Sequence, residues 1–418
     1  MSTEFTPPVP AIIPAGQLLD SPVSRRWTAR YSLVWFGYWI ASLVPLQLLL
    51  PQQLQDIDPG SKVTAFAVVN GISGLVTLIA LPICGALCDR SRNRFGRRRV
   101  WLSGGVLAFA TGVVVTSVQT TVTGVTIAWS ATMLGVSAAT AGLTAVIADR
   151  VPERQRGLIS SAIYGPQALG VVVGIALVAA FDLSPERGYL VVAALLVVCT
   201  LPFVLSYRDV VHSAEPTLKL RTVVASLGRS LKHRDFAWAF GGRVLVNLAN
   251  SLGTCYSLYF LIDGLKVADP ETSLLLVTVI YLAAGLAATT VAGILSDRLG
   301  RRRVFVAITA FLQALAGFLL AAFPSMTIYF VSSALMGGGF GAYMAVDQAL
   351  ITQVLPDAES RAKDLGIMNI GALVPPALAP LLASLFITSG MGYPALFTAV
   401  GIGATIGAAL TYRVRSVR

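Results

Sequence analysis

The chain has 418 residues, of which 55% are hydrophobic and only 12% are charged. A soluble domain carries about 25% charged residues, so this composition excludes an ordinary soluble protein. Apolar runs of about 20 residues, long enough to cross a bilayer as helices, recur along the whole sequence. The composition therefore predicts an all-α membrane protein that crosses the bilayer many times.

The net charge of +11 reflects where the basic residues lie. Of the 31 Lys and Arg, 27 fall in the termini and in loops that successive spans place on one side. The opposite side has only Lys62, Arg187 and Lys266. Basic residues concentrate on the cytoplasmic side of membrane proteins, so both termini are expected in the cytoplasm and the protein in the plasma membrane. The charge indicates topology, with a weak attraction to anionic lipid, and no nucleic acid partner is expected.

Twelve apolar runs are expected to be transmembrane helices. A proline-containing cytoplasmic leader, 1–26, comes first. The N-terminal half, 27–207, holds spans at 31–51, 62–87, 100–119, 122–147, 158–181 and 188–206. A polar cytoplasmic linker, 208–235, leads to the C-terminal half, 236–413, with spans at 236–261, 271–295, 304–323, 326–349, 364–387 and 393–412. Two parallel six-helix halves favour a transporter that binds its substrate near the midplane; a channel, a receptor and a membrane enzyme are the alternatives.

A basic loop bracketed by glycines follows the second span of each half. The first copy reads Gly85-x3-Asp89-Arg90 and then Gly96-Arg97-Arg98; the second reads Gly293-x3-Asp297-Arg298-x-Gly300-Arg301-Arg302. Gly85 and Gly293 are expected to let neighbouring helices approach closely. Each Asp is expected to pair with arginines or with the N-terminus of a facing helix.

These two copies resemble the signature loop of the major facilitator superfamily, and the resemblance covers residues 27–413. It implies a secondary transporter rather than an enzyme, without a cofactor, whose loops latch the cytoplasmic side shut. A simple topology anchor is the alternative role for the loops. The longer first copy, together with Asp347–Asn369, resembles the sucrose- and glycoside-transporting branch of the superfamily. The expected gate residues are Gly85, Asp89, Arg90, Gly96, Arg97, Arg98, Gly293, Asp297, Arg298, Gly300, Arg301 and Arg302.

Two ionisable residues lie within the predicted spans. Asp347 is the only one of the 20 acidic residues inside a span, and Arg243 is the only basic one. Both are expected at a similar depth near the cytoplasmic side, where they form a pair or share a polar cavity. Intramembrane charges are costly and usually functional, so the pair is a candidate site of proton coupling or gating. A structural ion pair is the alternative, and the lack of a carboxylate in the first span leaves uniport open.

Polar residues within the spans are candidates for contact with a small-molecule substrate. Arg243, Asn247 and Asn250 share one helical face, which is the strongest of these candidates. Uncharged amides and aromatic rings suit a neutral polyhydroxylated or amphipathic ligand, although hydrogen bonding between helices explains each residue alone equally well. The candidates are Gln47, Asn70, Gln167, Arg243, Asn247, Asn250, Tyr256, Tyr343 and Asn369.

The sequence therefore predicts a monomeric secondary transporter for a sugar or another neutral polar solute, with protons as the expected coupling ion. Gly165-Pro166-Gln167 partly resembles the fifth-helix motif of drug–proton antiporters, so efflux of amphipathic compounds is the alternative. A non-transporting receptor or an enzyme is the alternative from another class, and it lacks the paired acids or His clusters such chemistry uses. Cys84 and Cys88 stand one turn apart without a nearby His, so no metal site is expected.

Overall fold

The computed structural model describes residues 22–91, 96–207, 209, 233–299, 302–354 and 361–414. Within these ranges all regular structure is helical. The first part of the chain forms α2 (Arg25–Val44), η1 (Pro45–Leu49), α3 (Leu50–Ile57), α4 (Lys62–Arg90), α5 (Arg97–Ser117), α6 (Val122–Arg150), η2 (Glu153–Gln155), α7 (Arg156–Ala180) and α8 (Pro185–Ser206). The second part forms α10 (Arg234–Thr254), α11 (Ser257–Tyr259), η3 (Phe260–Gly264), α12 (Pro270–Leu299), α13 (Arg302–Ala322), α14 (Met326–Val354), α15 (Arg361–Thr388) and α16 (Gly392–Tyr412).

Local chemistry explains why these runs are helical. A segment in lipid must satisfy its backbone hydrogen bonds internally, and a helix does so along its length. Ser24 caps α2 by accepting the N–H of Trp27 at 3.2 Å, and Thr121 caps α6 by accepting the N–H of Gly124 at 3.1 Å. Hydroxyl side chains at the first position satisfy N–H groups that have no partner within the helix.

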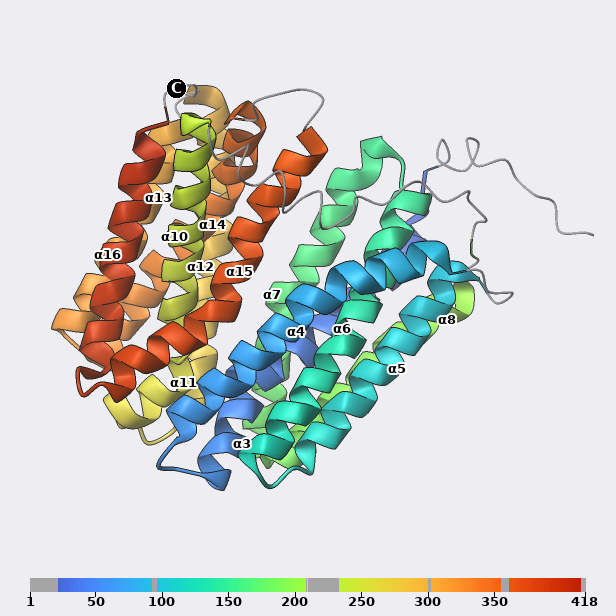
Figure 1. The fold of residues 1–418 in the computed structure, drawn as a ribbon, viewed down its shortest axis with the longest axis horizontal. Coiled ribbons are helices and arrows are strands. Elements are labelled where there is room, and N and C mark those ends of the chain that lie inside the picture. Colours follow the sequence, from blue (N-terminus) through green and yellow to red (C-terminus); the bar gives the residue numbers. More distant parts are fainter. Residues whose placement is uncertain are drawn as a thin grey trace, which may run out of the picture.

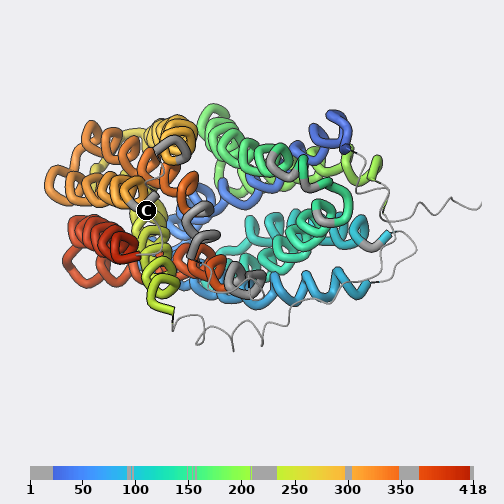
Figure 2. Tube along the Cα trace, turned by 90° about the horizontal axis from the view of Figure 1, so that it is seen from above, coloured from blue at the N-terminus to red at the C-terminus, as the bar shows by residue number. Residues whose placement is uncertain are grey.

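The helices pack as two bundles with matching internal contacts. In the first bundle α2 packs on α7 and α8, α5 packs on α6 and α8, and α4 packs on α6. In the second, α10 packs on α15 and α16, α13 packs on α14 and α16, and α12 packs on α14. Figure 2 shows the blue-to-green bundle beside the yellow-to-red one. The repeated contact pattern is the spatial counterpart of the repeated loop in the sequence.

The two bundles meet through two helix pairs, α4 with α15 and α7 with α12. The first contact depends on small residues of α4. A Cβ atom added at Gly71 would lie 2.7 Å from Leu381, and one added at Gly74 would lie 2.9 Å from Ala377. These glycines therefore allow α4 and α15 to approach closely, as small residues do between membrane helices.

Ten helical segments are long and apolar enough to cross a membrane, or eleven if α10 and the α11–η3 segment, bent by 42°, form one span. This count covers only the residues that the structure describes. Helix α14 has 29 residues but is not among these segments. The twelve-span count therefore stays a prediction.

The molecule has two distinct ends (Figure 1). Helices α3 and α11 lie together at one end, called here the α3 end, and the C-terminus lies at the other, called the C-terminal end. Helix α10 starts at the C-terminal end and α14 finishes there. Two π-helical turns, η1 and η3, occupy matching places toward the α3 end of the first helix of each bundle. Such turns often occur at functional sites.

Candidate functional site

Arg243 and Asp347 form a buried ion pair inside the second bundle. Nη1 of Arg243 donates to Oδ2 of Asp347, and the two side chains are 4% and 5% exposed. Tyr343, one turn before Asp347 on α14, donates its hydroxyl to Oδ1 of the same carboxylate at 2.8 Å. The pairing predicted from the sequence is confirmed.

Helix direction brings the two charges together. Arg243 lies in the first half of α10 and Asp347 in the last third of α14, so both lie toward the C-terminal end. The surroundings are apolar and include Val246, Val306 and Val346. In such surroundings removing one member of a pair leaves the other as an unpaired buried charge. A proton that reached Asp347 would therefore change the environment of Arg243 strongly, which is the chemistry a coupling site needs.

The predicted face of Arg243, Asn247 and Asn250 divides into two parts. Asn247 is buried, and its amide donates to the carbonyl of Arg243 at 2.8 Å within the helix. The Oδ1 atom of Asn250 instead accepts the hydroxyl of Tyr281, from α12, at 2.9 Å. Asn247 thus belongs to the Arg243–Asp347 site, whereas Asn250 ties α10 to α12. Tyr281 was missed, although it lies within a predicted span as the selected Tyr256 and Tyr343 do.

Three residues of the second bundle have buried polar atoms without a hydrogen-bonding partner among the described residues. The atoms are Nε of Arg243, Oγ of Ser332 in α14, and both amide atoms of Gln313, a fully buried residue of α13 packed against Gly339. Buried polar atoms in proteins are nearly always hydrogen-bonded, often to water. Gln313 was missed, although the criterion that selected Gln167, an amide within a predicted span, also fits it.

The remaining predicted substrate residues lie elsewhere. The amide of Asn70 donates to the carbonyl of Phe66 on its own helix at 2.9 Å. Gln47, within η1, and Gln167, in α7, are half-buried in the first bundle, and Asn369 is exposed. Tyr256 lies between the bundles at the α3 end. The structure therefore brings Arg243, Asn247, Tyr343 and Asp347 together and leaves the other six candidates, Asn250 among them, apart from this group.

The first copy of the basic loop builds a network around Arg98. Its guanidinium donates to Oδ1 of Asp89 and to Oδ2 of Asp149, each at 2.7 Å, and to Sγ of Cys88 at 3.2 Å. These bonds join α4, α5 and α6 at the C-terminal end. Asp209 adds a bond from the backbone N–H of Arg99 at 3.0 Å.

The backbone of this loop requires glycine at position 96. Gly96 has a φ of 101°, and an added Cβ there would collide with the side chain of Asp209. Asp89 is thus paired with an arginine, as predicted. Arg90 is exposed, and the side chain of Arg97 lies outside the described residues.

In the part of the chain that the structure describes, Gly85 and Gly293 are not points of close helix packing. A Cβ added at Gly85 meets none of the described atoms within 4 Å, and one added at Gly293 lies 4.0 Å from Ala345. Close approach occurs instead within the second bundle, where an added Cβ at Gly337 or Gly341 would collide with α12. In the second loop, the side chains of Asp297, Arg298 and Arg302 and the whole of Gly300 and Arg301 lie outside the described residues.

Polar contacts between the bundles gather at the α3 end. Nζ of Lys62 pairs with Oδ1 of Asp263 at 2.7 Å and lies 5.1 Å from the ring centroid of Tyr259. Gln52 donates to Oε1 of Glu271 at 2.5 Å. We call Gln52, Lys62, Tyr256, Tyr259, Asp263 and Glu271 the interbundle cluster.

Two tyrosines of this cluster donate to backbone carbonyls across the interface. The hydroxyl of Tyr259 donates to the carbonyl of Pro51 at 2.8 Å. The hydroxyl of Tyr256 donates to the carbonyl of Val63 at 2.9 Å, and the carbonyl of Pro380 lies 3.1 Å from the same oxygen. Tyr256, predicted to contact substrate, is thus part of the contact that closes the α3 end. These cross-bundle contacts were not predicted, because a single charge or tyrosine at the end of a span does not indicate its partner.

Known proteins resemble this chain in sequence and in fold. Two curated relatives are the multidrug resistance protein MdtL of Klebsiella pneumoniae (strain 342), 29% identical over 139 residues, and that of Shewanella sp. (strain ANA-3), 32% identical over 138 residues. Each alignment covers 33% of this chain and about a third of the relative, 35% and 34% respectively. A crystal structure of a mutant of the nucleoside transporter NupG superposes with a TM-score of 0.70 at 15% identity, over 93% of this chain and 98% of that one. That likeness shows a shared fold.

The family itself is shown by a sequence model that matches nearly the whole chain. The model of the Major Facilitator Superfamily matches residues 31–269 and 244–418. Together the two matches cover both loops and the helices described above; Arg243 lies in the first match and Asp347 in the second. The chain therefore belongs to the Major Facilitator Superfamily, and its described apolar helices are those of an integral membrane protein.

Proposed function

We propose that this transporter moves a small neutral polar solute, such as a sugar, together with protons, and that Asp347 is the coupling acid. The observation that carries the proposal is the buried pair of Arg243 and Asp347 with the Tyr343 hydroxyl on the same carboxylate. A carboxylate inside a span is costly to retain. Because this carboxylate lies against the buried Arg243, protonation of Asp347 changes the packing around both side chains strongly.

The coupling step follows from the contacts of this carboxylate. With Asp347 ionised, Arg243 is neutralised and α10 is held to α14. A proton on Asp347 removes the negative charge of the carboxylate, and Arg243 then lacks an ion-pair partner. Its unpaired Nε atom and the neighbouring amide of Asn247 make this region of α10 suited to bind the hydroxyl groups of a solute. Proton binding and solute binding thereby become linked.

Alternating access supplies the transport cycle. In this proposal the halves 27–207 and 236–413 move as rigid bodies around the linker 208–235, as in transporters built from repeats. With both termini in the cytoplasm of a cell membrane, the α3 end faces outside and its interbundle cluster closes that side. The protein acts as a monomer, because each chain contains both halves.

The choice of a neutral polar solute rests on chemistry and on a resemblance. The candidate residues beyond the ion pair are amides and hydroxyls, which suit polyhydroxylated molecules. The longer first loop and the stretch Asp347–Asn369 resemble the sucrose- and glycoside-transporting branch. Efflux of amphipathic compounds by proton antiport is the second candidate, because the two curated relatives are named multidrug resistance proteins.

Transport by purified protein in liposomes separates these two candidates. A thermal-shift screen of mono- and disaccharides and of amphipathic drugs first selects compounds that raise the apparent stability, as ligands of the native state do. We expect a sugar to be selected and to accumulate inside liposomes when the outside is made acidic. Uptake of a drug driven by an acidic interior would support antiport. Accumulation that ignores the pH gradient, or no transport at all, would contradict the proposal.

A further inference from the structure

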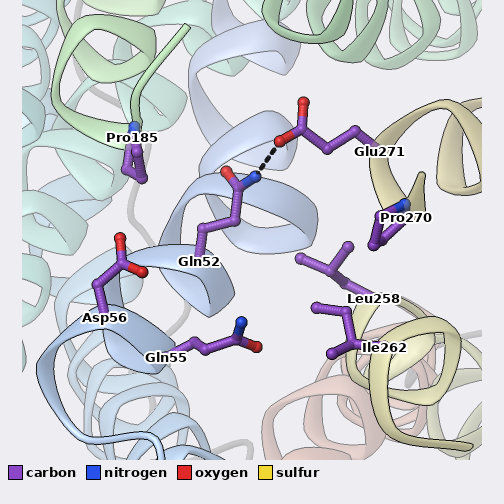
Figure 3. Close-up of a pocket in the computed structure, with 8 residues that line it drawn as sticks. All are labelled: Gln52, Gln55, Asp56, Pro185, Leu258, Ile262, Pro270 and Glu271. Atoms are coloured by element: carbon purple, nitrogen blue, oxygen red, sulfur yellow. Dashed lines mark hydrogen bonds between the residues drawn. The ribbon is translucent and has the colours of Figure 1, made fainter. Parts of the chain in front are cut away.

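A cavity of about 240 Å³ lies between the two bundles at the α3 end. The first bundle contributes residues of α3 and Pro185 of α8, and the second contributes α11, η3 and the start of α12. Figure 3 shows Gln52 and Glu271 facing each other from the two bundles, with Asp56 and Gln55 beside them. The lining residues are Gln52, Gln55, Asp56, Pro185, Leu258, Ile262, Pro270 and Glu271.

The polar side of this cavity is rich in hydrogen-bond acceptors and in negative charge. Among the residues that the structure describes, Asp56 and Glu271 are the charged members of its lining, which includes no lysine or arginine. Glu271 is half-buried, and its hydrogen bond comes from the neutral amide of Gln52. The Oε1 atom of Gln52 is itself buried and has no partner among the described residues.

The basic residues at the same end do not neutralise the cavity. Nζ of Lys62 is held by Asp263 at 2.7 Å and by the Oε1 atom of Gln55 at 3.1 Å, so its charge is already balanced. Arg187 and Lys266 are outside the lining. The charges that act on Glu271 most strongly are those of Asp182 and Asp269, which are also negative. A half-buried carboxylate among further acids creates a local excess of negative charge that attracts a cation.

The apolar side of the cavity decides which cation fits. Leu258, Ile262, Pro185 and Pro270 are the apolar residues of the lining. Calcium and magnesium ions take six or more oxygen ligands, and the four apolar side chains of this lining supply none. An ammonium group with attached methyl groups satisfies both sides, because its charge meets the carboxylates and its carbon atoms meet the apolar wall.

We propose that this cavity binds a small organic cation of the substituted-ammonium class. The bound cation bridges α3 of the first bundle and α12 of the second. Because the cavity exists only while these segments are together, binding stabilises the closed α3 end. The site goes beyond the proposed function, since it does not involve Asp347 and requires no proton coupling.

Isothermal titration calorimetry with choline tests this site on the full-length protein. The protein is placed in nanodiscs of phosphatidylglycerol, because choline headgroups of other lipids would compete. Choline should bind, and dimethylbutanol, its uncharged isostere with carbon in place of nitrogen, should not. Equal binding of the two, or tighter binding of sodium than of choline, would overturn the proposal.

Three variants locate the site. Glu271→Gln and Asp56→Asn should each weaken choline binding by roughly tenfold, the effect of one lost charge-assisted contact. Asp56→Asn leaves the hydrogen bond between Gln52 and Glu271 in place. A loss of choline affinity in this variant is therefore caused by the lost negative charge and not by a change in that contact. The matched control is Asp58→Asn, whose carboxylate binds Ser61 outside the cavity. Unchanged affinity in both cavity variants, or an equal loss in the control, would contradict the assignment.

Hydrogen exchange gives a second readout that does not depend on transport. Choline should slow exchange in the segments 50–57 and 257–264 of the wild-type protein, because both segments border the occupied cavity. The same addition to Glu271→Gln should have little effect at that concentration. Binding without this protection would show that the cation sits elsewhere and would overturn the proposal.

Discussion

At the α3 end, charged and polar side chains join the two bundles, whereas the Arg98 network and the Arg243–Asp347 pair each lie within one bundle. Lys62 and Asp263 are 12% and 37% exposed, while the members of the Arg243–Asp347 pair are almost fully buried. Contacts between bundles must break when the halves of a transporter move, and contacts inside a bundle need not. We therefore expect the loss of a pair within a bundle to lower folding stability the most, including the pair that we propose binds the coupled proton, and pairs between bundles to determine which conformation is populated.

The largest effect is expected at the buried pair. Asp347→Asn should lower the free energy of unfolding by about 3–5 kcal/mol, because Arg243 is left unpaired in an apolar environment. The double variant Arg243→Met with Asp347→Asn should recover part of this loss, since no charge remains buried. Unfolding by titration with sodium dodecyl sulfate in mixed micelles measures both. The single variants Asp347→Asn and Arg243→Met give the two separate losses of unfolding free energy. A loss in the double variant larger than the sum of these two losses would contradict direct pairing.

The Arg98 network should come next. Arg98→Gln removes charge-assisted bonds to Asp89 and Asp149 and should cost about 2–3 kcal/mol of folding stability. Its neighbour Arg99 provides the matched control, because its backbone N–H, not its side chain, makes the bond to Asp209. Arg99→Gln should cost well under 1 kcal/mol, as for other exposed or partly exposed charges. Equal losses in the same unfolding assay would show that Arg98 is not the centre of the network.

The pair between bundles should behave differently. Lys62→Gln should change the free energy of unfolding by no more than about 1 kcal/mol, because solvent screens a partly exposed pair. It should nevertheless open the α3 end more often, measured as faster hydrogen exchange in 50–57 and 257–264. Exchanging the charges, with Lys62→Asp and Asp263→Lys together, should restore slow exchange. If Lys62→Gln reduced stability as much as Arg98→Gln, the distinction between the two kinds of pair would be wrong.

The smallest effects concern the tyrosines at the α3 end. Tyr256→Phe removes a bond to a backbone carbonyl across the interface and should weaken the closed state by about 1 kcal/mol. Tyr393→Phe removes a hydroxyl that lies 3.4 Å from Oδ2 of Asp263, too long for a strong bond, and should have almost no effect. The same exchange experiment compares them. Similar acceleration in both variants would indicate that ring packing, not the hydroxyl bond, holds this interface.

Much of the fold was predictable because few backbone conformations are stable within a lipid bilayer. A long apolar run must become a helix, so the helices and the repeated arrangement follow from hydropathy and from the duplicated loop. The pairing of Arg243 with Asp347 was also predictable, because two opposite charges at similar depth in the membrane have few other partners. Within α14, Gly337 and Gly341 allow close packing against α12.

The contacts at the α3 end were not predictable from the sequence. Lys62 and Asp263 belong to different halves, and their meeting depends on how the bundles tilt against each other. Tyr256 looked like a residue that contacts substrate because it lies within a span, yet its hydroxyl bonds to a backbone carbonyl across the interface. Gly85 occupies a glycine position of the superfamily's signature loop, but no described helix packs closely against it in this conformation. Such features depend on conformation, which a single sequence pattern does not encode.

The central claim, that Asp347 couples proton movement to solute movement, is tested most directly by proton flux. Liposomes containing a trapped pH-sensitive dye receive the solute selected by the thermal-shift screen, with wild-type protein or Asp347→Asn. We predict that the solute acidifies the interior with wild-type protein, and that the variant still exchanges labelled solute without moving protons. Acidification by the variant at the wild-type rate would contradict the account.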